Sequence, residues 1–359
     1  MKHFNIHHDF KFNGVSYTKE ELAELAYSFI KEGASHEREL GDFLLDWLLP
    51  SQQITVQTSG STGAPKMISL LKEHMVNSAL ATGTYFNLKP KNSVLHCLPM
   101  QYIAGKMLAV RALVGGLHLD FIEPTSAPLS ENTKFYNFAA MVPLQLQNSL
   151  KFIDCIDKLI VGGTPVTKEI MALIKDKSCQ IYETYGMTET ITHIAARRVN
   201  GANDKILSAT VSPFKVLPKV VISKDKRDCL VIDAPHISKE TVYTNDLVRL
   251  ISDSEFVWLG RYDNIINSGG VKLIPEQIEL LLFPILKNRF FVTGLPDEKL
   301  GQKLILVIEG KVDKEEILKK IKLSGILDKY QIPKEVYAVN TFKETDNGKV
   351  LRNKTLEAI

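Results

Sequence analysis

A run of nine residues, 58–66, constrains this chain more than any other segment. Its sequence, Thr-Ser-Gly-Ser-Thr-Gly-Ala-Pro-Lys, combines two glycines, four hydroxyl side chains and a terminal lysine. Such a loop offers open backbone N–H groups, O–H donors and one mobile cation, which together suit phosphate oxygens. It is not the P-loop of nucleotide triphosphatases, because that loop requires Gly directly before the Lys and Pro65 stands there.

A flexible Ser/Gly linker is the alternative interpretation of this loop. Its Pro-Lys ending argues against a linker, and so does the apolar pattern that follows it, formed by Leu71, Met75, Ala79, Thr82 and Phe86. This spacing predicts a helix that starts just beyond the loop. We therefore interpret residues 58–66 as a phosphate-holding loop.

The composition is that of an ordinary globular protein with room for two or more domains, since the chain has 359 residues, 45% of them hydrophobic. The formal net charge of +3 gives no strongly basic face for nucleic acid. The four cysteines show no CxxC spacing, which indicates buried thiols of a reducing compartment. Without a signal core or an apolar run long enough to cross a bilayer, we expect a cytoplasmic protein with no membrane insertion.

The first two thirds of the chain alternate helical and strand patterns. Thr18 and Glu21 form a capping box before an amphipathic helix that Gly33 ends. Residues 94–98 and 117–122 resemble strands. The clearest unit runs from a strand at 158–163, through a helix begun by Thr164 and Pro165 with Val166, Ile170, Leu173 and Ile174 on one side, to a strand at 180–183. This βαβ unit predicts an α/β fold with mostly parallel sheets.

The sequence pattern that predicts secondary structure changes twice toward the C-terminus. From about 197 to 260, β-branched alternation predicts a β-rich part, either a twisted antiparallel sheet or a partial barrel. Beyond Arg261 we expect a separate small α+β domain, with a helix opened by Pro275, strands at 290–292 and 304–308, and a Lys-rich helix capped by Asp313. The predicted domains are therefore a large one at 1–260 and a small one at 261–359.

Four further segments carry candidate chemistry. Thr188 and Glu189 follow a strand of the βαβ unit, at the sheet edge where ligands of α/β folds collect. Thr188 can donate to phosphate, and Glu189 offers Mg²⁺ a hard oxygen ligand. Asp246 can accept from two ribose hydroxyls, although an Asp in a turn is more often only a turn residue. Segment 260–272 adds the paired glycines Gly269 and Gly270, which suggest a tight turn near a swivel at the domain boundary, and segment 346–352 adds a tail lysine, Lys349.

Taken together, the order and spacing of these segments resemble the adenylate-forming superfamily of acyl- and aryl-CoA ligases, adenylation domains and luciferases. The loop at 58–66 fits the family signature at every position, and the resemblance runs from about Thr58 to the C-terminus. It implies two half-reactions in one site: ATP and a carboxylate give an acyl adenylate and pyrophosphate, and a thiol, commonly that of coenzyme A, then displaces AMP. Positioning and charge neutralisation are expected to dominate both steps.

The resemblance also implies roles for individual residues. The β- and γ-phosphates would be held by Thr58, Ser59, Gly60, Ser61, Thr62, Gly63 and Lys66. Adenine would stack on Tyr185, next to Gly186 and beside the turn formed by Gly162, Gly163 and Thr164. Thr188 would touch phosphate, Glu189 would bind Mg²⁺, and Asp246 with Arg261 would hold the ribose.

A mobile small domain is part of the same expectation. Lys349 matches the family lysine that bridges the carboxylate and the α-phosphate, and Asp263 matches the hinge about which the small domain turns. In the thioester-forming state, Lys272, Gly269 and Gly270 would lie near the path of the thiol.

The acid is less clearly encoded. Where the family usually reads Pro-x-aromatic-His-x-x-Gly, this chain has Tyr102 in place of His before Gly105. A lone cation, Arg111, follows in an otherwise apolar segment and needs a partner. Either an internal carboxylate such as Asp120 or Glu123 supplies it, or Arg111 grips a second carboxylate of the substrate.

The second option resembles o-succinylbenzoate–CoA ligases of menaquinone synthesis, which place a cation at this spacing. His193 would then line the acyl pocket, with a satisfied structural histidine as the alternative. Only 57 residues precede Thr58, so a trimmed N-terminal sheet is expected.

Three hypotheses follow. The first is an o-succinylbenzoate–CoA ligase with ATP, coenzyme A and Mg²⁺. The second keeps the adenylation but changes the acid or the acceptor, either to another aryl or acyl acid or to a carrier protein. The third is a nucleotide-binding, non-catalytic protein that needs a partner. The sequence leaves a homo-oligomer open.

Overall fold

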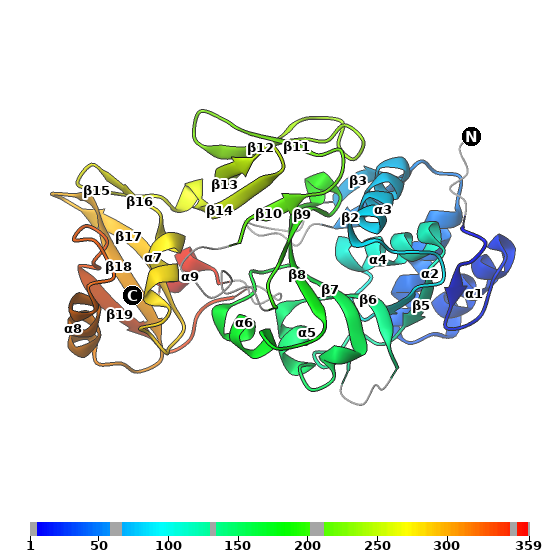
Figure 1. Ribbon diagram of the computed structural model, residues 1–359, viewed down its shortest axis with the longest axis horizontal. Coiled ribbons are helices and arrows are strands. Elements are labelled where there is room, and N and C mark those ends of the chain that lie inside the picture. Colours follow the sequence, from blue (N-terminus) through cyan, green and yellow to red (C-terminus); the bar gives the residue numbers. More distant parts are fainter. Residues whose placement is uncertain (1–5, 58–66, 130–133, 202–211, 345–349, 358–359) are drawn as a thin grey trace. The chain divides into compact units, whose positions relative to one another are not determined.

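The computed structural model describes residues 6–57, 67–129, 134–201, 212–344 and 350–357 (Figure 1). The chain forms two compact units, one of Met1–Ile222 with Ile232–Val242, the other of Ser223–Val231 with Tyr243–Ile359. The domain boundary after residue 260 stays a prediction.

The first unit holds six described helices and most of the strands. Its helices are α1 (Lys19–Glu32), α2 (Ser35–Leu48), α3 (Lys72–Phe86), α4 (Ile103–Gly115), α5 (Pro143–Asn148), α6 (Lys168–Ile174) and the 3-10 turns η1 (Ile153–Cys155) and η2 (Thr188–Thr190). Its strands are β1 (Lys11–Phe12), β2 (Gln53–Gln57), β3 (Met67–Leu71), β4 (Ser93–His96), β5 (His118–Phe121), β6 (Tyr136–Met141), β7 (Ile156–Val161), β8 (Gln180–Gly186), β9 (His193–Arg198) and β10 (Phe214–Val216).

The main sheet of this unit has the strand order β1-β5-β4-β6-β7-β8-β9-β10. The pairs from β1 to β8 are parallel, and β8–β9 and β9–β10 are antiparallel. The sequence's expectation of a mostly parallel α/β sheet is therefore confirmed. It also follows that β7 and β8 end at the same edge, where the candidate residues after each strand meet.

Helices cover both faces of this sheet. One face packs against α5 and α6, whose buried Leu146, Ile170 and Ile174 join a core with residues of β4, β6, β7 and β8. On the other face Phe86 of α3 packs against Phe138 of β6 and Tyr182 of β8, with ring centroids 5.6 and 5.1 Å apart. Figure 1 shows α5 and α6 together beside β7 and β8.

Several local predictions are confirmed. Thr18 and Glu21 form the capping box of α1, and the backbone N–H of Gly33 closes its last turn. Strands β4, β5, β7 and β8 lie within or close to their predicted ranges.

Two details of the prediction were wrong. The helix after the phosphate loop does not start directly beyond it, because β3 intervenes and pairs with β2 before α3 begins at Lys72. In the βαβ unit the helix begins at Lys168, capped by the Thr167 side chain, rather than at Thr164 and Pro165. Leu173 is consequently 54% exposed, because it lies on the outer side of the shorter helix α6.

The remaining elements belong wholly or partly to the second unit. Strands β11 (Val221–Lys224), β12 (Cys229–Asp233) and β13 (Val242–Ser252) contain residues of both units. The others are β14 (Glu255–Arg261), η4 (Tyr262–Asn264), β15 (Ile266–Ser268), β16 (Val271–Leu273), α7 (Pro275–Leu282), β17 (Phe290–Asp297), β18 (Gly301–Glu309), α8 (Lys314–Ser324), β19 (Glu335–Val339) and α9 (Arg352–Leu356).

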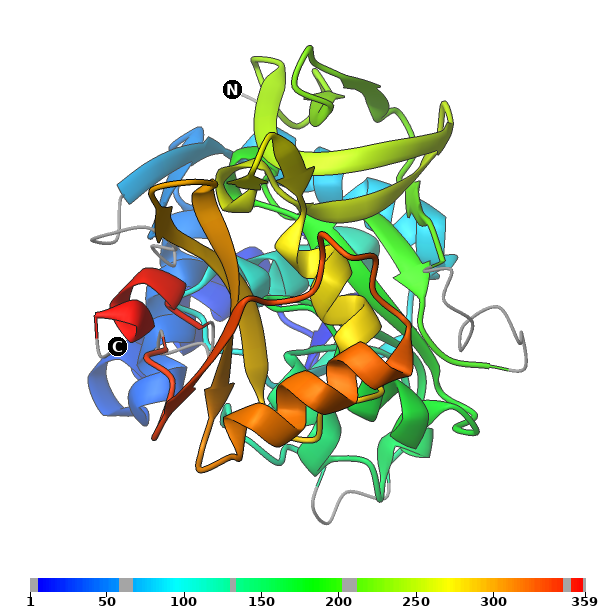
Figure 2. The same ribbon diagram turned by 90° about the vertical axis from the view of Figure 1, so that its left-hand side faces the viewer.

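The C-terminal part of the second unit is a small α+β layer structure. Helices α7 and α8 pack through Ile278, Leu282 and Ile321 on one face of the β15–β19 sheet, and Leu356 of α9 packs on the other. Figure 2 shows α7 and α8 close together on one side of these strands, and α9 on the other side. The predicted cap Asp313 accepts from the backbone of Glu315 and Glu316.

None of the helices that the structure describes is long and apolar enough to span a membrane.

One buried cation ties the start of α3 to the end of α2. The Lys72 ammonium donates to the carbonyl oxygens of Asp46, Trp47 and Leu49 at 2.6, 3.0 and 2.8 Å, and the residue is fully buried. These are carbonyls of the last turn of α2, which have no partner inside the helix. Lys72 therefore fixes the strand that leaves the phosphate loop against α2.

We predict that Lys72→Met lowers the free energy of unfolding by about 3 kcal/mol, because three carbonyl groups at the end of α2, one of them in a buried bond, lose a charged donor while the apolar stem is kept. Urea unfolding followed by circular dichroism measures the change. Lys31→Met on the exposed side of α1 is the matched control. Equal unfolding midpoints for the two variants would contradict the capping role.

Candidate active site

Part of the predicted site lies outside the described residues. This applies to Thr58, Ser59, Gly60, Ser61, Thr62, Gly63, Lys66 and Lys349. The described flanks nevertheless show how the phosphate loop is held, since Gln57 of β2 pairs with Met67 of β3 in an antiparallel ladder. The loop is thus the connection of a β-hairpin, and its two ends are fixed side by side.

The turn after β7 runs directly beside β8. A Cβ at Gly162 would lie 2.7 Å from Thr184 Oγ1, and Gly163 has a φ of +93°, a conformation that favours glycine. Thr164 follows and is half-buried. The predicted adenine turn therefore needs both glycines for geometric reasons.

The segment after β8 lies at the same edge. Tyr185 is half-buried, and its ring packs on Phe214 of β10 with centroids 5.8 Å apart. A Cβ at Gly186 would lie 2.2 Å from the Thr192 carbonyl oxygen, so only glycine allows β8 and β9 to approach so closely here. Thr188 and Glu189 lie on η2. Glu189 is exposed, and no ion pair within the described ranges occupies its carboxylate, which fits a ligand for Mg²⁺.

An ion pair that sequence reasoning missed stabilises this edge. Arg197 of β9 donates from Nε and Nη2 to Glu183 Oε2 of β8 at 2.8 and 2.6 Å, and both side chains are largely buried. Glu183 Oε1 also accepts from the Val166 backbone N–H at 3.3 Å. The pair therefore joins β8, β9 and the turn after β7. The available signal was a single acidic residue within a predicted strand of the βαβ unit.

The predicted ribose residues lie together in the second unit. Asp246 of β13 is 6% exposed, and its register partner on β14 is Arg261. Trp258 Nε1 donates to Asp246 Oδ1 at 3.0 Å, and Arg261 Nη1 lies 3.4 Å from the same oxygen. Trp258 was not singled out from the sequence, because its position opposite Asp246 depends on the β13–β14 pairing.

The predicted hinge residue Asp263 is exposed, and its carboxylate accepts hydrogen bonds from two neighbouring side chains. It accepts from Arg261 Nη2 at 3.2 Å and from Asn245 Nδ2 at 3.1 Å. Arg227 in turn donates to Asn245 Oδ1 at 2.9 Å, and its guanidinium lies over the Tyr262 ring. Residues of the turn before β12, of β13 and of η4 thus converge on the point where the hinge is predicted.

The paired glycines form the tight turn expected of them. Gly269 and Gly270 have φ values of +57° and +83° and connect β15 to β16 through the pair Ser268 and Val271. Positive φ at both central residues is the requirement of a type I′ hairpin. Lys272 is exposed on β16, next to this turn. The parts of these residues in the thioester step stay predictions.

Arg111 lies in α4 and is 3% exposed. Its Nη2 reaches Thr192 Oγ1 and His193 Nδ1, both at 3.4 Å, and no carboxylate of the described chain forms an ion pair with it. Asp120, one of the expected partners, instead accepts from Lys134 and Tyr136. Burial lowers the pKa of Arg111 to about 9, because the guanidinium loses hydration and gains no carboxylate partner among the described residues.

His193 of β9 is held in one protonation state. Because arginine can only donate, His193 Nδ1 must accept from Arg111, and Nε2 then carries the proton toward Thr82 Oγ1 at 3.4 Å. The Thr82 hydroxyl in turn donates to the Ser78 carbonyl oxygen at 3.0 Å, which leaves its oxygen free to accept from Nε2. Burial, together with the Arg111 charge, moves the pKa of His193 well below its usual value. Helices α3 and α4 and strand β9 thus place a neutral imidazole beside an uncompensated guanidinium.

The other two predicted acid-pocket residues lie at the start of α4. Tyr102 is half-buried just before the helix. Gly105 is buried, and a Cβ there would lie 2.3 Å from the Pro99 carbonyl oxygen. The Gly105 carbonyl oxygen lies 2.9 Å from His96 Nε2. Packing alone accounts for glycine at this position, and contact of either residue with substrate stays a prediction.

Known proteins resemble this chain over most of its length. The AMP-binding enzyme family matches residues 54–229. A 2-succinylbenzoate–CoA ligase of Listeria monocytogenes is 26% identical over 371 residues, which cover 96% of this chain and 75% of that protein.

Two solved structures share the fold. An acyl-CoA synthetase (AMP-forming)/AMP-acid ligase II-like protein of Dyadobacter fermentans is 33% identical with a TM-score of 0.62, covering 94% of this chain and 98% of that one. An o-succinylbenzoate CoA synthetase of Bacillus subtilis, in complex with the acyl-adenylate intermediate OSB-AMP, is 19% identical with a TM-score of 0.72, covering 94% of this chain and 80% of that one. The mostly parallel sheet, the residues gathered at the ends of β7 and β8 and these likenesses agree, and the chain belongs to the family of AMP-binding enzymes.

Proposed function

We propose that this chain is an ATP-dependent acid–thiol ligase of the cytoplasm that converts o-succinylbenzoate to o-succinylbenzoyl-CoA. The observation that carries the choice of acid is the buried Arg111, to which the described chain supplies no carboxylate. A buried charge without a partner is costly, and a carboxylate of the substrate would offset that cost. The acid of the proposed reaction has two carboxylates, one to be activated and one for Arg111.

The reaction has two balanced steps. A carboxylate oxygen attacks the α-phosphorus of ATP, the bond to pyrophosphate breaks, and an acyl adenylate forms. The sulfur of coenzyme A then attacks the acyl carbon, loses its proton, and AMP leaves with the electron pair of the broken C–O bond. Mg²⁺ held by Glu189 would neutralise phosphate charge in the first step.

Residues of this chain would position the nucleotide. Tyr185, fixed by Phe214, would stack on adenine, and Thr188 would donate to phosphate. Asp246 would accept from the ribose hydroxyls, oriented by Trp258 and Arg261. Lys66 and Lys349 would supply the cations that bring an anion against a polyanion.

The relatives' names support this assignment, since the Listeria protein is named for 2-succinylbenzoate and the Bacillus structure contains its adenylate. A ligase for another acid, or an enzyme loading a carrier protein, is the second candidate. A non-catalytic nucleotide-binding protein is the third, and the exposed carboxylate of Glu189, which forms no ion pair with the residues described by the structure, counts against it.

We predict that the purified chain releases pyrophosphate and AMP when given ATP, Mg²⁺ and o-succinylbenzoate, and forms the thioester only when coenzyme A is added. Lys349→Ala should abolish pyrophosphate release, because the attacking carboxylate loses its counter-charge. Coupled pyrophosphate detection and chromatography of nucleotides measure both.

Formation of ADP would refute adenylation. Full turnover with a phosphopantetheinyl carrier protein, and none with coenzyme A, would favour the second candidate. A chain that releases no pyrophosphate with any acid would favour the third candidate, the non-catalytic nucleotide-binding protein.

For the acid, we predict that Arg111→Met lowers kcat/KM for o-succinylbenzoate by at least about 30-fold, as expected when one partner of a buried charge pair is truncated. The matched control is 4-oxo-4-phenylbutanoate, the same acid without the ring carboxylate, which should lose little with the same variant. An equal loss for the two acids would remove Arg111 from recognition while leaving the adenylation intact.

For the nucleotide, we predict that Trp258→Phe raises KM for ATP about tenfold, because Asp246 loses one orienting hydrogen bond. The KM for the acid should not change, since the hydrogen bond that Trp258 loses goes to Asp246. Tyr243→Phe, on an exposed position of the same β13–β14 pair, is the control. An unchanged KM for ATP in Trp258→Phe would contradict the orienting role.

A further inference from the structure

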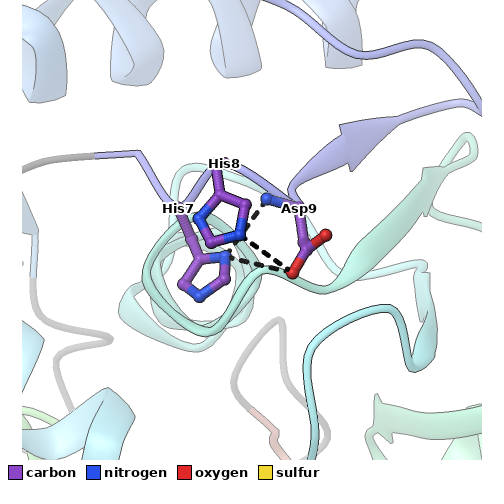
Figure 3. A group of neighbouring side chains, drawn as sticks. All are labelled: His7, His8 and Asp9. Carbon is purple, nitrogen blue, oxygen red and sulfur yellow. Dashed lines mark hydrogen bonds and ion pairs between the residues drawn. The ribbon is translucent and has the colours of Figure 1, made fainter.

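Two histidines and an aspartate lie together in the turn before β1, at the edge of the sheet remote from the residues that follow β8. Figure 3 shows His7 and His8 side by side, both directed toward the Asp9 carboxylate. Asp9 Oδ2 lies 3.9 Å from His7 Nδ1 and 3.4 Å from His8 Nε2, and one ligand atom from each residue lies within 4.8 Å of the others. Two ligands that are each about 2.1 Å from a tetrahedral ion are about 3.4 Å apart, so this spacing is close to that of a bound metal.

The turn is fixed by the fold. The His7 backbone N–H donates to the Leu113 carbonyl oxygen at 2.8 Å, and the Phe10 N–H donates to the His7 carbonyl oxygen at 2.9 Å. Phe10 and Phe12 are both buried, and β1 pairs with β5. The two imidazole rings are stacked, with centroids 4.5 Å apart. The backbone that carries the three side chains is therefore ordered before any ion binds.

The protonation state of His7 suits a ligand. The Asp9 backbone N–H donates to His7 Nδ1 at 3.2 Å, so Nδ1 carries a lone pair and the proton lies on Nε2. Lys91 lies 3.3 Å from Asp9 Oδ1 and leaves Oδ2 to the imidazoles. A metal ion would replace one weak hydrogen bond at Nδ1 and the two contacts at Oδ2.

The surroundings favour a cation. A Cβ at residue 116 would lie 2.3 Å from His7 Nδ1, so Gly116, with a φ of +66°, makes room for the imidazole at the C-terminal end of α4. The carbonyl end of a helix attracts positive charge. Two imidazole nitrogens and one carboxylate are ligands typical of Zn²⁺, Ni²⁺ or Cu²⁺ rather than of Mg²⁺.

We propose that His7, His8 and Asp9 bind one divalent transition-metal ion of the Zn²⁺ class, with water completing its coordination. All three protein ligands come from the turn before β1, and the end of α4 leaves space for the His7 ring. This site is separate from the proposed Mg²⁺ ligand Glu189, and it does not depend on the proposed reaction.

The test uses the full chain without a polyhistidine tag, stripped of metal and titrated with ZnCl₂ in a calorimeter. One Zn²⁺ per chain is expected, with a rise in Tm, and excess Mg²⁺ should not displace it. Loss even of an outer partner of a metal ligand costs about 10–100-fold in affinity, so His8→Ala and Asp9→Asn should each weaken binding at least tenfold. His36→Ala is the control, because that ring packs on Phe121 away from the cluster.

His8 is exposed and Asp9 is half-buried, and circular dichroism verifies that the two variants remain folded. No binding of Zn²⁺ to the wild-type chain would overturn the proposal, and so would equal affinity in wild type, His8→Ala and Asp9→Asn. In that case the three side chains form only ion pairs between protonated histidines and Asp9.

Discussion

The buried ion pair between Glu183 and Arg197 sets the geometry on which the first unit's site depends. It lies where the sheet changes from parallel to antiparallel pairing, since Glu183 and Arg197 are register partners on β8 and β9. Removing either partner would leave an uncompensated charge in the core, which typically costs about 3–5 kcal/mol. Because Glu183 also accepts from Val166, the same carboxylate fixes the turn that holds Gly162 and Gly163. The predicted adenine turn and the strand that leads to Tyr185 and Glu189 are therefore both anchored to this one ion pair.

A second buried cation, Arg111, differs from Arg197 in how its charge is compensated. Arg197 has a carboxylate within its own chain, whereas Arg111 contacts only neutral groups among the described residues. The neutral state of His193 matters here, because a protonated imidazole would add a second positive charge beside the guanidinium. Burial, with Arg111 itself, lowers the pKa of His193 and excludes that state near neutral pH. Arg197 is thus neutralised by a carboxylate of its own chain, whereas the charge of Arg111 can be neutralised by a carboxylate of a diacid.

The sequence predicted what local chemistry controls. The capping box at Thr18, the Asp313 cap, the Gly269–Gly270 turn and the parallel strands β7 and β8 all follow from short-range patterns, and the structure confirms them. It did not predict β3, because that strand is stabilised by pairing with β2 across a loop. Nor did it reveal Trp258 or Arg197, whose partners lie 12 and 14 residues away on neighbouring strands. The sequence could not decide whether an internal carboxylate or a carboxylate of the substrate is the partner of Arg111. The structure shows that Asp120, one of the internal candidates, pairs with Lys134 instead.

The contacts at Asp263 bear on how a hinge there would work. The predicted ribose residues Asp246 and Arg261 are register partners in the β13–β14 ladder, and both precede the predicted hinge along the chain. A rotation at Asp263 would therefore leave the β13–β14 ladder intact and move Lys349, which follows it. The rotation would have to break the contacts of Asp263 with Arg261 and Asn245. The ion pair to Arg261 is exposed, and exposed ion pairs contribute only about 0–1 kcal/mol, so it would hold an orientation without locking it. Weak contacts at this point are what an enzyme with two half-reactions requires, because each turnover would have to pass through both orientations.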